Sequence, residues 1–127
     1  MKRSLSVLAL VVMTLMASNA LAAGQPAKAA TRAVTLKGEI VDLGCYLGHG
    51  ARGADHKSCA TRCIANGMPF GLLTAEGKLY LVTMDHDNPD PFNQCKSLAA
   101  ETVVLSGPMV QRSGLMAVEV TSVKAAK

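Results

Sequence analysis

The chain has 127 residues, a formal net charge of +4 at neutral pH, four cysteines and no tryptophan. This length predicts one small domain once an export segment is set aside. The low charge and the few aromatic residues, two phenylalanines and two tyrosines, argue against the basic, aromatic-rich surface that binds single-stranded nucleic acid, so we expect no nucleic-acid partner.

The first 22 residues have the pattern of an export signal peptide. Lys2 and Arg3 precede an apolar run that ends near Met16, and Ala20-Leu21-Ala22 offers small residues for cleavage. The run is shorter than the roughly 20 residues of a membrane span. We therefore predict that residues 1–22 are removed and that the protein is exported to the periplasm or the extracellular space, without membrane attachment. The loss of Lys2 and Arg3 leaves eleven basic and nine acidic residues, a charge of +2.

Residues 23–33 predict a flexible leader, and residues 34–124 predict a single folded domain. From Val34 to Ile40, apolar or small residues alternate with polar ones, which is typical of a β-strand with one face in water. The following segment, LGHGARGAD, contains three glycines and predicts a flexible loop with Cys45 at its start.

A short helix is predicted over Lys57–Ala65. Asp55 or Ser58 can cap its N-terminus, and Asn66-Gly67 can supply the left-handed residue that ends it. Pro69 follows, where a helix could not continue.

The remaining chain predicts four more strands. FGLLT and KLYLVTM flank a turn at residues 75–78 and predict a β-hairpin. DHDNPDPFN reads as a polar loop, QCKSLAAE can form one or two helical turns, and ETVVLSGPMVQ and LMAVEVTSV predict the last two strands, joined by Arg112-Ser113-Gly114. A mainly β chain with these elements suits a small, five-stranded, partly open barrel of the OB (oligonucleotide/oligosaccharide-binding) type, with a short helix after the first strand.

Short motifs run through most of this domain: Asp42-Leu43-Gly44-Cys45, then Cys59 and Cys63 followed by Gly67. In this order they resemble small exported bacterial OB-fold-like proteins of unknown function that carry a D-x-x-C … C-x-x-x-C-x-x-x-G pattern. The resemblance implies an OB-like barrel and an export route, and it implies no reaction. Cys95 departs from the pattern.

A cysteine and histidine cluster is the strongest candidate site. On a regular helix, His56, Cys59 and Cys63 fall within roughly 60° of one another and share one face. We expect Cys45, at the edge of the barrel, to meet this face. The three thiols, together with His56 or with His49, would form a set that suits zinc or cuprous copper. His56 must then lie at or outside the first helical turn, because seven helical residues extend about 10.5 Å.

Two other interpretations use the same cysteines. In a small exported domain they favour structural disulfides, with Cys45 joined to Cys59 or Cys63 and Cys95 joined to the remaining helix cysteine. Alternatively, Cys59 or Cys63 could perform thiol–disulfide redox chemistry, because a helix N-terminus and the nearby Lys57 favour a thiolate.

A hydrolase that combines Asp42 and Cys45 with a histidine can also be drawn, but nothing in the sequence fixes its geometry. We therefore expect a binding or structural protein rather than an enzyme. Its cluster would be closed by disulfides or would hold zinc or copper, and the sequence does not identify a protein or small-molecule partner.

Overall fold

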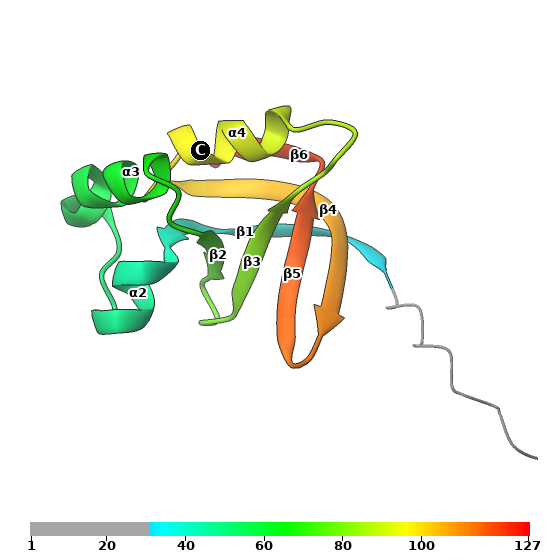
Figure 1. Cartoon of the computed structure of the whole chain (residues 1–127), viewed down its shortest axis with the longest axis horizontal. Helices are drawn as coiled ribbons and strands as arrows, with labels where there is room; N and C mark the ends of the chain where they lie inside the picture. The colour runs from blue at the N-terminus through cyan, green and yellow to red at the C-terminus, as the bar shows by residue number, and fades with distance from the viewer. Residues whose placement is uncertain (1–30) are drawn as a thin grey trace, which may run out of the picture.

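Residues 31–127 are described by the computed structural model, and five of their strands close into a barrel (Figure 1). The strands are β1 (Arg32–Asp42), β2 (Phe70–Thr74), β3 (Leu79–Met84), β4 (Thr102–Arg112), β5 (Leu115–Val120) and β6 (Ser122–Ala125). The helices are α2 (Leu43–His49), α3 (Lys57–Ala65) and α4 (Asp90–Ser97), and the 3-10 turn η1 (Ala54–His56) leads into α3.

The barrel follows the order β1-β2-β3-β5-β4, and β4 pairs back with β1. The β3–β5 pair is parallel and the others are antiparallel. β6 follows β5 in the chain and, like β5, pairs antiparallel with β4. This is an OB-like barrel. The predicted mainly β, OB-like fold with a short helix after the first strand is therefore confirmed, and the β1–β4 pairing closes the barrel.

β1 holds the barrel together because it pairs along both edges. Residues 32–39 pair with β4 and residues 38–42 pair with β2. Gly38 takes part in both pairings, and a Cβ atom there would lie 2.5 Å from the carbonyl oxygen of Leu73. Only glycine permits the two strands to approach this closely.

The core is one cluster of buried side chains inside the barrel and beneath two helices. The alternation predicted for the first strand is observed, since Ile40 is fully buried while Thr35 and Lys37 are exposed. Helices α3 and α4 close the cluster with Ala60, Ile64 and Cys95. The strand residues in it include Ile40, Leu72, Val82, Val103, Leu105, Val118 and Val120.

The predicted flexible loop LGHGARGAD, residues 47–55, is wrong at its start, because residues 47–49 belong to α2. Asp42 caps this helix by accepting a hydrogen bond from the backbone N–H of Cys45, and Gly50, at φ 73°, ends it. A good N-cap and a left-handed C-terminal glycine outweigh the low helix propensity of the two glycines inside α2. The chain ahead of α2 also differs slightly, because β1 begins at Arg32, within the predicted leader 23–33.

Two further boundaries differ from the prediction. α4 begins at Asp90, inside the predicted polar loop, because Pro91 occupies the first helical turn, where the missing N–H costs nothing. The last predicted strand is interrupted at Thr121, whose backbone N–H and hydroxyl both donate to the carbonyl oxygen of Ser106. The predicted helix over Lys57–Ala65 and the predicted hairpin are confirmed.

The predicted signal peptide, residues 1–22, and residues 23–30 of the predicted leader lie outside the described residues. Among the helices of the described part, none has the length and apolar character needed to cross a membrane.

Candidate metal centre

Asp42 is the residue around which the candidate site is built. It ends β1, its side chain is fully buried, and it caps α2. One carboxylate oxygen, Oδ1, accepts from the backbone N–H of Cys45 at 2.8 Å, and the other, Oδ2, lies 3.0 Å from Nε2 of His56. A single buried carboxylate thus connects the end of β1, the start of α2 and the start of α3.

The tautomer of His56 follows from this contact. Burial by itself raises the pKa of Asp42. The hydrogen bonds from Cys45 and His56 together lower this pKa by more than burial raises it, so it lies below its ordinary value of 3.8. An ionised carboxylate only accepts hydrogen bonds, so Nε2 of His56 carries the proton and donates it. When the ring is neutral, Nδ1 keeps its lone pair and is available to a metal.

Three thiols converge from two helices. Cys45 lies in the first turns of α2, and Cys59 and Cys63 lie one turn apart on α3. The three sulfur atoms lie within 4.8 Å of one another, and those of Cys59 and Cys63 are 4.0 Å apart. All three side chains are partly exposed. The expected meeting of Cys45 with the sulfur-bearing face of α3 is confirmed.

Backbone contacts explain why α2 and α3 meet at one end of the barrel (Figure 1). The left-handed Gly67, at φ 95°, turns the chain back after α3, and the N–H of Met68 donates to the carbonyl of Cys63 at 2.9 Å. The carbonyl of Pro69 then accepts from the N–H of Leu43, the first residue of α2, at 2.9 Å. The loop that leaves α3 therefore contacts the start of α2 before it enters β2.

A second group of ligands shares Cys45. Potential ligand atoms of Asp42, Cys45 and His56 also lie within 4.8 Å of one another. His56 lies just before the first turn of α3, as the length of the helix requires for a shared site. His49, the other predicted histidine, is exposed in the last turn of α2 and belongs to neither group of ligands among the described residues.

Cys95 lies apart from the three clustered thiols. It is the residue that α4 buries fully in the core, and burial raises the pKa of its thiol to about 11. All four cysteines are free thiols in the described residues, and no pair lies at bonding distance. An S–S bond is about 2.05 Å long, so a disulfide between Cys59 and Cys63 would require their sulfurs to approach from 4.0 Å.

The protonation of the thiols follows from burial and from their acidic neighbour. Burial and the carboxylate of Asp42 raise the pKa of Cys45 to about 12. Burial and the nearby Cys59 raise the pKa of Cys63 as well. These two thiols therefore hold their protons at neutral pH, and a bound cation would have to displace them.

The spacing of the sulfurs suits a metal. Four ligands arranged tetrahedrally at a zinc–sulfur distance of about 2.3 Å are separated by about 3.8 Å. The observed 4.0 Å between Cys59 and Cys63 is close to this value. The three thiols can therefore hold a metal ion, and the His56–Asp42 pair lies beside Cys45.

Asp42 is the site residue that the sequence predicted least well. Its position three residues before Cys45 was visible as a D-x-x-C motif, and the same spacing is a helix-capping pattern. The capping role of Asp42 was not predicted, because a loop and not a helix was expected after it.

No protein-family model matches the chain, and no curated protein or solved structure matches it.

Proposed function

We propose that this protein binds one soft metal ion, zinc or cuprous copper, through the thiols of Cys45, Cys59 and Cys63. The observation that carries the proposal is the convergence of three sulfur atoms from two separate helices within 4.8 Å. Thiolates are the ligands that both ions favour. A binding role accounts for the geometry without any reaction.

His56 is the fourth ligand in the zinc form. Zinc-binding histidines usually donate their second ring N–H to a carboxylate, which fixes the orientation of the ring. The contact between His56 and Asp42, at 3.0 Å, is such a pair, and it leaves Nδ1 for the metal. Cuprous copper, as a softer ion, needs only the three sulfurs.

The site suits an ion that enters and leaves the folded protein. Cys45, Cys59 and Cys63 are partly exposed, whereas the barrel core is buried and formed from other side chains. The protein therefore offers its thiols to solvent without unfolding. Together with the export signal expected at residues 1–22, this supports a metal-binding protein of the periplasm or the extracellular space.

The test is to purify the protein from its native compartment without added reductant and to measure bound zinc and copper by elemental analysis, together with intact mass with and without thiol alkylation. One ion per chain is expected, and Cys45→Ser, Cys59→Ser or Cys63→Ser should each abolish its retention. Cys95→Ala is the matched control, because it removes a thiol that lies outside the cluster. A metal-free protein whose mass is lower by two hydrogens for each cysteine pair would overturn the proposal.

The variant His56→Ala distinguishes zinc binding from copper binding. Zinc affinity should fall by at least about 10- to 100-fold, the cost of losing only the outer partner of such a ligand, and cuprous copper affinity should remain unchanged. Equal loss of both ions would show that His56 binds both, and no loss of either would remove it from the ligand set.

The redox alternative rests on the 4.0 Å separation of the sulfurs of Cys59 and Cys63. It requires one of the two to ionise below neutral pH, whereas the pKa of Cys63 is raised. The alkylation experiment distinguishes the two functions, because a redox protein would show a labile disulfide and no retained ion.

A further inference from the structure

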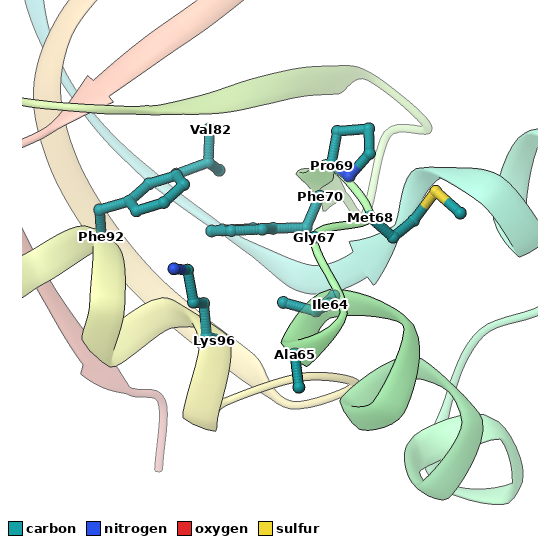
Figure 2. A pocket seen from close by; sticks show the side chains of 9 residues that line it. All are labelled: Ile64, Ala65, Gly67, Met68, Pro69, Phe70, Val82, Phe92 and Lys96. Carbon is teal, nitrogen blue, oxygen red and sulfur yellow. The ribbon is translucent and has the colours of Figure 1, made fainter.

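An apolar pocket lies between the end of α3, the start of β2 and α4, outside the metal centre (Figure 2). Its volume is about 250 Å³. Ile64, Phe70 and Val82, all nearly fully buried, line its inner part. The exposed Met68 and Pro69 lie at its rim, and Figure 2 shows the side chain of Met68 directed away from the rings.

The pocket combines two aromatic rings with one charged amine. The rings of Phe70 and Phe92 are 4.9 Å apart between centroids, at an interplanar angle of 32°. The Nζ atom of Lys96, from α4, lies 5.0 Å from the centre of the Phe92 ring, and Figure 2 shows it directed toward the two rings. Among the described residues that line the pocket, Lys96 alone is charged.

The charge of Lys96 is not neutralised within the described part of the chain. The ion pairs found there join His56 to Asp42 and Lys57 to Glu101. A cation over an aromatic ring at the wall of an apolar cavity favours an anion that brings its own apolar surface. We propose that this pocket binds a small monocarboxylate with an apolar body, its carboxylate on Lys96 and its body against Phe70 and Phe92.

The size of the pocket limits the ligand. Sites for drug-sized molecules occupy about 300–1,000 Å³, so this pocket suits a smaller one. At about 30 Å³ for each water, it has room for about eight waters, which is near the size of a medium-length alkyl or phenyl carboxylate. Octanoate is a suitable probe, with octan-1-ol and octylamine as its neutral and cationic counterparts.

The experiment is calorimetric titration of the full mature protein with the three probes at pH 7. Octanoate should bind at least about tenfold more tightly than octan-1-ol, since a charge-assisted contact contributes more than a neutral one. Octylamine should bind most weakly. Lys96→Met, which keeps the length of the side chain, should lower octanoate affinity to the level of octan-1-ol. Lys78→Met, in the exposed β2–β3 turn, is the matched control and should change nothing.

Several outcomes would overturn the inference: no binding of octanoate, equal binding of the three probes, or unchanged octanoate binding by Lys96→Met. Amide NMR shifts of the wild-type protein provide a test without any variant, since octanoate should shift Phe92 and Lys96 and leave the β4–β5 turn, residues 112–115, unaffected. Octanoate binding should survive Cys45→Ser, because that residue belongs to the metal centre. A protein that binds no metal could therefore still bind octanoate, and a protein that does not bind octanoate could still bind a metal.

Discussion

At the scale of single residues, Asp42 has the largest role in the candidate site. Its two oxygens serve different elements, since Oδ1 caps α2 and Oδ2 holds His56 at the start of α3. A buried carboxylate is stable in such a position only when its oxygens are satisfied by donors. The same side chain therefore contributes to stability and to the orientation of a metal ligand.

Asp42→Asn should destabilise the metal-free protein by about 1–3 kcal/mol, because the charged hydrogen bond to His56 becomes a neutral one. The pKa of Asp42 is lower in the folded protein than its ordinary 3.8, so the stability it contributes is present above pH 3.8 and is lost as the pH falls below it. Urea unfolding at pH 6 and at pH 3 should show a difference between wild type and variant that shrinks at the lower pH. Asp87→Asn, in an exposed loop, should show no difference at either pH.

Cys95 should be chemically inert in the folded protein. It is fully buried, and at pH 8 a thiol with a pKa of about 11 is ionised to only about one part in a thousand. Iodoacetamide should therefore modify at most three thiols of the native, metal-free protein, and a fourth only after unfolding. Mass spectrometry of alkylated peptides checks this, and rapid native labelling of Cys95 would contradict its burial.

At the scale of elements, the candidate site depends on two short helices that contribute unequally to the core. α2 has no buried residue, whereas α3 buries Ala60 and Ile64. α2 is held by the Asp42 cap and by the hydrogen bond from Leu43 to Pro69. The position of Cys45 therefore rests on a few polar contacts, while Cys59 and Cys63 are placed by packing.

Two glycines in different elements differ in the space around them, and substituting each one tests how closely the elements pack. A Cβ at Gly107 would collide with the carbonyl of Glu119, so Gly107→Ala should destabilise the barrel by about 1–3 kcal/mol or more. Gly48, inside α2, has open space around it, so Gly48→Ala should be neutral or stabilising by up to about 1 kcal/mol. Thermal unfolding of the two variants checks both values, and a stable Gly107→Ala protein would contradict the close approach of β4 and β5.

At the scale of the whole molecule, the barrel and the candidate metal site are separate structures. The buried cluster contains Cys95 but none of the three clustered thiols, and the pairing of β1 with β4 closes the barrel without them. We therefore expect the barrel to fold without an ion, unlike a zinc finger, whose site supplies its folding energy.

Metal removal should consequently leave the barrel folded. After chelation, circular dichroism should keep its β spectrum and the protein should still unfold cooperatively. Zinc at a hundred times its dissociation constant should add about 2.7 kcal/mol to the free energy of unfolding, because the ion binds the folded state. Collapse of the β spectrum on chelation would show that the ion is structural.

Local patterns predicted most of the elements well. The helix over Lys57–Ala65 and the hairpin between β2 and β3 depend on nearby residues such as Gly67 and Gly77, so short-range chemistry identified them. α2 was missed because its glycines suggest a loop, whereas its cap uses Asp42 at the end of a strand. Its formation depends on where that strand places the carboxylate.

The sequence by itself determined the strand pattern, the position of α3 and the shared face of Cys59 and Cys63, because these follow from periodicity and from neighbouring residues. It also offered these thiols as candidate ligands of a soft metal, with disulfides as the alternative. Only the tertiary structure decided that Cys45 joins them, that His56 rather than His49 is beside it, and that Cys95 is buried elsewhere. Those outcomes depend on contacts between residues far apart in the chain, and the closure of the barrel sets such distances.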